Sequence, residues 1–378
     1  MPKLNVRRFS GRIYGLTVSL AVLVGLQSPS YGLTGFSYKK SCVQALNGSS
    51  SSIEIIKKSL GGSTWPEETK ENFSFMEFNV LNMIDITDAG KMQDGAQFIA
   101  EAHKSFAKPL SQLEGIARLV AFHKPLLAFF VEVGSVKVLR DYDQEFLGNQ
   151  YEEFSIEGND PRGVDVGLLL RKDLPLDIEV HSHKNLTDDS TGALVFSRDL
   201  PVFILREKGV DKPLMLVFGT HFKSQRSTDG DPLGFKKRSM QVRAASQLIA
   251  DYEKLYPGVP VILTGDFNND VRRSPEFGPL RNIGLVDSFD VAKDTTPLQS
   301  RGTHFYFPRS GPSSVNQLDA IMLNQAAVQK LKIKSAKVLS HIDPQGNLYP
   351  PPKNYGERET RASDHLPILT VIDLKAAP

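Results

Sequence analysis

The pattern that most constrains the fold is a series of apolar runs, each about as long as a β-strand, that recur between residues 73 and 373. These runs are residues 75–81, 126–133, 164–170, 193–196, 214–220, 259–264, 320–323 and 366–371. Segments with helical periodicity lie between some of them, at residues 95–107, 109–123 and 237–256. From Met240 to Tyr252 an apolar side chain recurs every four residues, so we expect this helix to pack one face on a sheet. The pattern predicts an α/β fold.

Neither an internal repeat nor a linker interrupts this region, so we expect one large domain over residues 71–376. A chain of 378 residues with 40% hydrophobic residues can bury a sizeable core without disulfide bonds. Cys42 is the only cysteine, which excludes a disulfide framework, a CxxC redox pair and a cysteine-ligated zinc site. Residues 33–70 contain a serine run and a double-glycine break, and we interpret them as an N-terminal extension.

The first 32 residues have the pattern of a secretory signal peptide. Basic residues from Lys3 to Arg12 precede an apolar stretch at residues 13–26, and small residues follow near a cleavage point that we place after Gly32. The apolar stretch is shorter than the roughly 18 to 20 residues that a membrane anchor needs. We therefore expect a secreted protein, extracellular or periplasmic, with no transmembrane segment in the mature chain.

Polar residues stand at the ends of several apolar runs, where a buried strand would not favour them. They are Asn79, Glu132, His221, Asp266, Asn268, Asp319, Asp364 and His365. Taken singly, most of them have a structural interpretation as a turn, a cap or a satisfied interior side chain. Glu132 is harder to explain in that way, because a carboxylate inside an apolar run costs free energy unless a cation or donors balance it. Strand ends that meet at one sheet edge would bring the whole set into a single pocket.

The chemistry of this set favours a hard cation and a phosphate ester. Carboxylates and amides without cysteine are the ligands of Mg²⁺, Mn²⁺ or Ca²⁺. A metal Lewis acid next to a histidine and an aspartate suits the attack of water on a phosphate ester, because negative charge grows on the transferring group and must be stabilised.

The order of these segments resembles the endonuclease/exonuclease/phosphatase superfamily, which includes the DNase I-like nucleases. The matching segments are Phe78-Asn79-Val80, Val131-Glu132-Val133, Thr220-His221, Gly265-Asp266-Phe267-Asn268, Leu318-Asp319 and Ser363-Asp364-His365-Leu366-Pro367. The match extends over residues 73–373, and the segments at 79–83, 158–166 and 221–224 look most like secreted bacterial nuclease-type members. The resemblance implies a four-layer α/β sandwich, with two mixed β-sheets packed face to face and helices outside.

The resemblance also implies how the site holds a metal and activates water. Glu132 would hold the divalent metal, with Asn79 beside it and Asp364 as a further acidic ligand. Mg²⁺ is the expected ion, and Mn²⁺ or Ca²⁺ are alternatives. Asp266 would orient or deprotonate the attacking water, and Asn268 would position the same water or a phosphate oxygen.

Two histidines complete the implied site. His365 would contact the scissile phosphate while Asp319 holds its ring, and His221 would supply a second phosphate contact or a general acid. Val131 precedes Glu132 where many relatives have glutamine, and Ala320 follows Asp319 where relatives often have histidine or tyrosine. These departures concern the rim of the pocket and therefore the substrate preference.

Basic residues near the expected site indicate how a substrate is held. The segment from His221 to Arg243 is rich in Lys and Arg and includes Lys223, so it is suited to a nucleic-acid backbone; the alternative is a solvated loop. Arg162 lies between a turn signal and a strand, where a fixed guanidinium would clamp a phosphate or form a structural ion pair.

The leading hypothesis is a secreted, metal-dependent endonuclease that hydrolyses DNA or RNA with low sequence specificity, as a monomer without a stable protein partner. The first alternative is a phosphatase or sphingomyelinase-like phosphodiesterase acting on lipid or inositol phosphates. That alternative calls for an exposed aromatic or apolar hairpin, and no long insertion of this kind is evident in the sequence. The second alternative is an inactive binding module of the same fold, which predicts the loss of a metal ligand or of the water-activating aspartate.

The net charge of the whole chain, +2, does not by itself indicate nucleic-acid binding. Four of its 45 basic residues and none of its 43 acidic residues lie in the predicted signal peptide, so the mature chain would be slightly acidic. Affinity for nucleic acid must therefore come from the local placement of basic residues and from the metal.

Overall fold

In a computed structural model of the protein, the structure describes residues 53–90, 95–308 and 310–376. The predicted signal peptide and Cys42 lie outside these residues. None of the described helices is long and apolar enough to span a bilayer.

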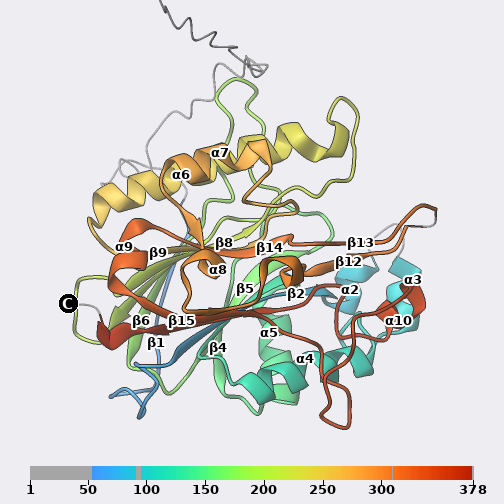
Figure 1. Ribbon diagram of the computed structural model, residues 1–378, viewed down its shortest axis with the longest axis horizontal. Helices are drawn as coiled ribbons and strands as arrows, with labels where there is room; N and C mark the ends of the chain where they lie inside the picture. Colours follow the sequence, from blue (N-terminus) through green and yellow to red (C-terminus); the bar gives the residue numbers. More distant parts are fainter. Residues whose placement is uncertain (1–52, 91–94, 309, 377–378) are drawn as a thin grey trace, which may run out of the picture. The chain divides into compact units, whose positions relative to one another are not determined.

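Two seven-stranded mixed sheets form the framework (Figure 1). The first sheet contains, in spatial order, β1 (Ile55–Ser59), β6 (Leu176–His181), β7 (Val202–Glu207), β8 (Met215–His221), β9 (Val261–Asp266), β14 (Asp319–Leu323) and β10 (Val286–Asp287). The second contains β11 (Asp294–Thr295), β15 (Lys332–Val338), β16 (Ile368–Asp373), β2 (Phe73–Met83), β3 (Leu127–Val133), β5 (Asp165–Arg171) and β4 (Tyr151–Ser155). The pairs β8–β9, β2–β3 and β11–β15 are parallel, and the other pairs in these sheets are antiparallel.

A separate two-stranded hairpin and a set of helices complete the described residues. The hairpin consists of β12 (His304–Tyr306) and β13 (Ser314–Asn316). The α-helices are α2 (Ile86–Ala89), α3 (Gly95–Ala100), α4 (Leu110–His123), α5 (Val136–Tyr142), α6 (Phe235–Leu255), α7 (Gly278–Asn282), α8 (Ser288–Val291), α9 (Gln325–Lys330) and α10 (Tyr355–Glu359). The short helical turns are η1 (Asp143–Leu147), η2 (Pro232–Gly234), η3 (Pro275–Phe277), η4 (Leu298–Ser300) and η5 (Leu374–Ala376).

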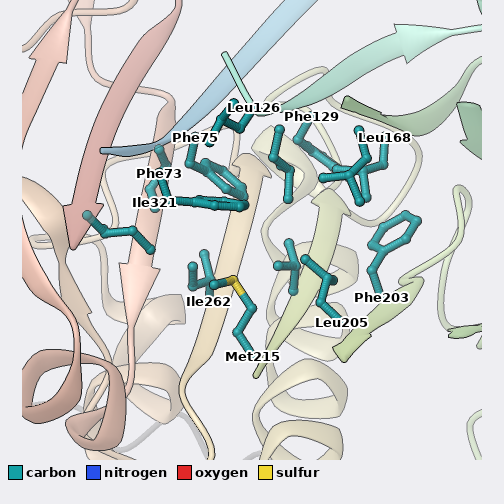
Figure 2. Packing of buried hydrophobic residues seen from close by; sticks show 14 of the residues in the cluster. Phe73, Phe75, Leu126, Phe129, Leu168, Phe203, Leu205, Met215, Ile262 and Ile321 are labelled. Carbon is teal, nitrogen blue, oxygen red and sulfur yellow. The ribbon is translucent and has the colours of Figure 1, made fainter. Parts of the chain in front are cut away.

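The inner faces of the two sheets pack on each other through a continuous apolar core (Figure 2). Phe75 and Phe129 of the second sheet enter the same cluster as Phe203 and Ile262 of the first. The rings of Phe129 and Phe203 meet edge to face, with centroids 6.4 Å apart. Each buried phenylalanine of this kind stabilises the fold by roughly 1.5–3 kcal/mol, so the contact between the sheets is a main source of stability.

Helices cover the outer faces. The long helix α6 packs Leu248 and Tyr252 into the cluster on the outer side of the first sheet. Helices α4 and α5 contribute Leu113, Ile116 and Leu139 to the cluster on the outer side of the second sheet (Figure 1). The order of layers is thus helix, sheet, sheet, helix, which confirms the predicted four-layer α/β sandwich.

The predicted helices agree in part with the observed ones. The segments 109–123 and 237–256 form α4 and α6 with ends shifted by one or two residues. The segment 95–107 is helical only to Ala100. A tight turn follows, in which the His103 backbone N donates to the Phe106 carbonyl and Phe106 is buried.

Two other segments differ from expectation. Residues 193–196 form a single bridge through Leu194 rather than a strand, although Val195 and Phe196 are buried beside the first sheet. Strand β1 belongs to the predicted extension at 33–70, yet it pairs along its whole length with β6. Residues 55–59 are therefore an edge strand of the first sheet and not a separate spacer.

Candidate active site

The strand register brings three predicted residues into one row across the first sheet. Asp266, the last residue of β9, pairs with His221 at the end of β8 and with Asp319 at the start of β14. Gly265 allows the close approach of β8 and β9: its φ is +134°, and a Cβ atom there would lie 1.9 Å from the Thr220 carbonyl oxygen. Any other residue would strain the backbone next to Asp266.

A β-bulge at the matching end of the second sheet turns Glu132 out of the ladder. Val131 and Val133 both pair with β5, and Glu132 between them does not. Its φ is +63°, a conformation that costs about 1–2 kcal/mol for a residue other than glycine. The Glu132 side chain remains 20% exposed, and its Oε2 accepts a hydrogen bond of 3.2 Å from the Asn82 backbone N. The bulge therefore explains how a carboxylate fits into an apolar strand.

Side-chain hydrogen bonds connect the two sheets at this edge. Asn79 Nδ2 donates to Asp266 Oδ2 at 3.1 Å, and Ser363 Oγ donates to the Asn79 carbonyl at 2.7 Å. His365 Nδ1 lies 2.7 Å from Asp319 Oδ2. These contacts place residues from β2, β9, β14 and the segment before β16 in one cluster.

The partners of His365 favour its charged form. Burial lowers the pKa of His365, but the Asp319 carboxylate, with Asp364 and Asp266 further away, outweighs burial and raises this pKa well above its usual value. His365 is therefore an imidazolium at neutral pH. Its Nδ1–H donates to Asp319, which leaves Nε2–H to face a bound anion.

Asp266 is a buried carboxyl group whose proton affinity is raised. Burial, together with the charge of Asp319, raises the pKa of Asp266 to about 7. The Asp266 Oδ1 atom accepts a hydrogen bond of 2.7 Å from the Asn268 backbone N. A group with a pKa near 7 can both accept and release a proton at neutral pH, which suits a general base.

Glu77 lies in β2, two residues before Asn79, and is fully buried without a side-chain hydrogen-bond partner among the described residues. Burial, followed by the charges of Asp319 and Asp266, raises the pKa of Glu77 well above its usual value. Glu77 is therefore protonated and neutral near Asp319 and Asp266.

His221 differs from His365 in its charge. Its Nε2 lies 3.8 Å from Glu132 Oε1 and 3.7 Å from Asp266 Oδ2, which are too long for hydrogen bonds. Burial, together with the positive charges of Arg198 and Arg162, lowers the pKa of His221 well below its usual value. His221 is thus a neutral imidazole that faces the carboxylates.

Asp364 belongs to the cluster, and its charged neighbours include His304 and Arg358. Asp364 Oδ2 lies 3.6 Å from His304 Nε2 and 3.8 Å from Arg358 Nη1. Although burial raises the pKa of Asp364, these neighbours and His365 outweigh it and hold this pKa below its usual value. Asp364 is therefore an anion.

Two groups of three side chains bring possible ligand atoms within 4.8 Å of one another. One group is His304, Asp364 and His365, and the other is Asp266, Asp319 and His365. Glu132, the expected principal metal ligand, lies outside both groups. Asn79 uses its amide oxygen to accept from the Leu81 backbone N, so its side chain is held in place by protein contacts.

Asn268 and Lys223 lie beside the cluster and already have partners. Asn268 has a φ of +57°, and its Nδ2 donates to the Phe222 carbonyl at 3.0 Å. Lys223 Nζ donates to the Arg226 carbonyl at 3.0 Å. Burial, with the charge of Arg198, lowers the pKa of Lys223, so this lysine lies close to other cations.

Of the two roles that the sequence allowed for Arg162, a phosphate clamp or a structural ion pair, the structure shows the ion pair. Its Nε and Nη2 atoms donate to the two oxygens of Asp160 at 3.0 and 2.9 Å. Arg198 Nε lies 3.0 Å from Asp160 Oδ2. The side chain of Arg162 is nevertheless 42% exposed, whereas that of Arg198 is 8% exposed. Both arginines act on the pKa of His221, so they contribute positive charge to the site.

No family model and no curated protein sequence matches the chain. Several solved structures do match its fold. An endonuclease/exonuclease/phosphatase from Bacteroides vulgatus is 15% identical, with a TM-score of 0.51 over 80% of this chain and 98% of its own. A mannosyl-6-phosphatase from Bacteroides thetaiotaomicron is 18% identical, with a TM-score of 0.51 over 79% and 99%. Truncated TDP2 from Caenorhabditis elegans is 14% identical, with a TM-score of 0.50 over 80% and 97%.

The chain has the DNase I-like fold. At these identities the likeness concerns the fold, and it confirms the resemblance and the fold class inferred from the order of the sequence segments. In this DNase I-like fold, the cluster described above occupies the edge where the polar ends of β2, β3, β8 and β9 meet.

The structure adds charged residues that sequence reasoning missed. Lys108 is buried, and its Nζ donates to the Leu81 carbonyl at 2.9 Å. Burial lowers the pKa of Lys108 to about 8, while the negative charges of Asp364 and Glu132 act to raise it. Lys108 and Arg198 do not stand at the end of a strand, so the signal that found the other residues does not apply to them.

Proposed function

We propose that this protein is a metal-dependent phosphodiesterase. The observation that carries the proposal is the His365–Asp319 pair, with its Nδ1–Oδ2 distance of 2.7 Å, next to the buried carboxyl group of Asp266. An imidazolium and a general base at one sheet edge suit hydrolysis of a phosphate ester. The DNase I-like fold supports the proposal, because the structural neighbours include proteins named as a phosphatase and as an endonuclease/exonuclease/phosphatase.

The donor atoms at the site fit a hard divalent cation. Glu132 and Asp364 are carboxylates with partly exposed side chains, and Asp364 Oδ2 lies 3.6 Å from His304 Nε2 and 3.8 Å from Arg358 Nη1. Oxygen donors of this kind favour Mg²⁺, with Mn²⁺ as an alternative. We propose that Glu132 and Asp364 hold the ion with Asn79 beside them. When bound, the ion would supply Lewis-acid stabilisation of the negative charge on the phosphoryl oxygens.

The residues of the chain have separate roles in the proposed reaction. His365 Nε2–H donates to a phosphoryl oxygen, and Asp319 orients the imidazolium. Asp266 accepts the proton of the attacking water, while Asn268 positions that water or a phosphoryl oxygen. His221, a neutral imidazole beside Glu132 and Asp266, supplies a second polar contact to the phosphate.

We propose a polynucleotide, DNA or RNA, as the substrate, cleaved by a secreted monomer. The charges of Arg162, Arg198 and Lys223 beside His221 support this choice, because cations along a backbone supply most of the non-specific affinity for nucleic acid. Residues 71–376, together with the edge strand β1, would form the catalytic domain, and residues 1–32 would direct export.

A phosphodiesterase acting on lipid is the second candidate, and one observation favours it. The hairpin of β12 and β13 exposes Tyr306 by 51% and Val315 by 54%, although the sequence showed no long insertion. The side chains of Tyr306, Phe307 and Tyr355 line a cavity of 1060 Å³ beside this hairpin. Aromatic side chains of this kind are suited to stacking on a base or to contact with a membrane surface.

One assay tests the proposal. The purified protein is incubated with plasmid DNA, RNA and sphingomyelin vesicles, each with Mg²⁺ or with EDTA. We expect cleavage of DNA or RNA that EDTA abolishes and Mg²⁺ restores. Asp266→Asn should abolish this cleavage, and Asp211→Asn, which changes an exposed aspartate before β8, should not.

Three outcomes separate the alternatives. Cleavage of sphingomyelin alone would favour the lipid enzyme. Cleavage that persists in EDTA would rule out the proposed metal chemistry. No hydrolysis of any substrate under Mg²⁺ or Mn²⁺, with intact folding, would favour the inactive binding module.

A further inference from the structure

A second polar cavity, of 520 Å³, lies next to the proposed site on the same sheet edge. Its lining includes Asn269 and Gln317, which follow Asn268 and precede Asp319 in the sequence. The Gln317 amide Nε2 lies 3.4 Å from the Asp319 carbonyl. On the opposite side, Gln225 Nε2 donates to the Asn268 carbonyl at 2.9 Å. The cavity therefore shares its wall with two proposed catalytic residues.

The cavity has an excess of positive charge. Arg272, Arg273 and Arg301 line it, against the single carboxylate of Asp270 among its lining residues. Arg301 serves the fold, because its guanidinium donates to the Thr296 and Phe289 carbonyls and pairs with a nearby aspartate. The positive charge available to a ligand therefore comes from Arg272 and Arg273.

These two arginines are held only loosely by the protein. Arg272 Nη2 lies 3.3 Å from Asp270 Oδ2, and its buried Nε has no hydrogen-bond partner among the described residues. Arg273 Nε lies 3.8 Å from the same carboxylate, and its side chain is 76% exposed. A guanidinium with unused donors recognises phosphate through paired hydrogen bonds.

A buried amide in the cavity wall has unused capacity as well. Gln317 is 7% exposed, and its Nε2 donates to Asp287 Oδ2 at 2.7 Å. Its Oε1 atom is buried and has no partner among the described residues. Leaving a buried amide oxygen unpaired is unfavourable, because the group has lost its water without gaining a donor. A ligand or water with a donor group would satisfy this oxygen, and a nucleotide offers such donors in its base N–H groups and, in RNA, in the 2′-hydroxyl.

We propose that this cavity is a second phosphate subsite, which binds the sugar-phosphate unit next to the cleaved linkage of a polynucleotide. The proposal rests on the proposed phosphodiesterase activity and names the part of the substrate that the chain holds outside the reacting atoms. Arg272 and Arg273 bind the flanking phosphate, and Gln317 Oε1 accepts from an N–H of the neighbouring base or, in RNA, from the ribose 2′-hydroxyl. The subsite favours chains of linked phosphates over esters that carry one phosphate.

The experiment compares substrates with and without a flanking phosphate. The first substrate is a single-stranded oligothymidylate, and the last is bis(4-nitrophenyl) phosphate. Between them are two further oligothymidylates, each with one neutral methylphosphonate. It stands on the 5′ side of the cleaved linkage in one and on the 3′ side in the other. In the double variant Arg272→Gln/Arg273→Gln, we expect the KM for the oligothymidylate to rise about tenfold, because two phosphate contacts are lost. The effect on bis(4-nitrophenyl) phosphate should be much smaller.

The control is Lys212→Gln/Lys332→Gln, which removes the same charge from two exposed residues. Lys212 precedes β8 and Lys332 begins β15, so both lie at the strand ends that are away from the proposed site. It should leave both substrates unchanged. With the wild-type protein, one of the two methylphosphonate oligonucleotides should have a higher KM than the unmodified oligothymidylate. For that oligonucleotide, the double arginine variant should raise the KM little further, because the contact is already lost. Anisotropy of a labelled oligothymidylate in EDTA measures the same loss of affinity without catalysis.

The results distinguish failure of the proposed subsite from failure of the proposed phosphodiesterase activity. If the wild-type protein with Mg²⁺ hydrolyses neither the oligothymidylate nor bis(4-nitrophenyl) phosphate, the proposed function fails. If both are hydrolysed but the arginine variant affects both substrates equally, or the control variant weakens the oligonucleotide as much, the subsite is wrong. The subsite is also wrong if neither methylphosphonate changes the wild-type KM, a result that does not depend on the folding of any variant.

Discussion

Two buried histidines in this protein, His365 and His183, have opposite charge states. His365, at the edge of the sheets, contacts a carboxylate and has a raised pKa. His183 lies beneath α6, where its Nδ1 is 2.8 Å from the Leu200 carbonyl and its Nε2 is 3.3 Å from the Tyr252 hydroxyl. Burial lowers the pKa of His183 to about 4.

The pKa values of His365 and His183 differ because of the partners of the two rings and not because of their burial. His365 and His183 are 6% and 4% exposed, so both rings lose most of their water. A carboxylate compensates the charge of His365, whereas a carbonyl and a hydroxyl do not compensate a charge on His183. The direct contact with Asp319 therefore distinguishes the charged ring of His365 from the neutral ring of His183.

The largest expected effect is the loss of the charged ring. His365→Ala should lower kcat by about 10³ to 10⁴, because the phosphoryl oxygens lose a charged donor. Asp319→Asn keeps the ring but removes its partner, so kcat should fall by about 100-fold. Steady-state hydrolysis of the oligothymidylate under saturating Mg²⁺ measures both. Activity retained in His365→Ala would show that the site has been assigned wrongly.

A smaller effect on activity is expected from the neutral histidine of the site. His221→Ala should lower kcat by about 10- to 100-fold, since an uncharged contact stabilises the transition state less than a charged one. The same assay under the same conditions gives the ratio of the two losses. If His221→Ala cost as much as His365→Ala, the distinction between a charged and a neutral role would be wrong.

The packing histidine should control stability and its dependence on pH. The folded-state pKa of His183 is about 4, below its unfolded value of about 6.5, so the unfolded state takes up the proton first. Stability is thus fully present above pH 6.5, and this group lowers the free energy of unfolding by about 1.4 kcal/mol per pH unit as the pH falls toward 4.

His183→Gln tests this dependence. Urea unfolding at pH 7 should show a loss of about 1–2 kcal/mol, with kcat at pH 7 unchanged. Between pH 6.5 and 5 the variant should lose less stability than the wild type, because one of the buried imidazoles is absent. An equal loss in both proteins would show that His183 does not contribute to the acid sensitivity.

The smallest effect is expected for His341, which is neutral like His183 but contacts the backbone of His365. It is buried and has a pKa lowered to about 3 by burial, yet its ring also bonds to the backbone of His365. His341→Gln should lower kcat less than tenfold and leave KM and the pH profile unchanged, since it positions His365 without touching the substrate. A shift in the pH profile would assign His341 to the reacting group itself.

Much of the fold could be predicted from local patterns. The spacing of Met240 to Tyr252 indicated α6, and the apolar runs indicated most of the long strands, because periodicity depends on neighbours in the sequence. The run at residues 193–196 was misleading: its apolar side chains pack beside the sheet without pairing as a strand. The edge strand β1 was missed because its alternating pattern lies in a polar, serine-rich region.

The polar residues at strand ends indicated part of the cluster, and charged residues elsewhere were missed. Asp266, Asp319 and His365 come together as expected, but Lys108 and Arg198 lie in loops and reach the site only through the packing of those loops. Glu132, the expected metal ligand, lies outside both close groups of possible ligand atoms among the described residues. Loop placement depends on contacts between residues far apart in the chain, which local patterns do not record.

The sequence by itself determined the layered α/β architecture and the set of oxygen and imidazole groups at the strand ends. Only the tertiary structure decided their chemical state. His365 and Asp319 are separated by 46 positions in the sequence and meet at 2.7 Å, while the bulge at Glu132 depends on the register of β3 against β5. Protonation depends on lost water and on nearby charges, and both exist only after the two sheets have packed.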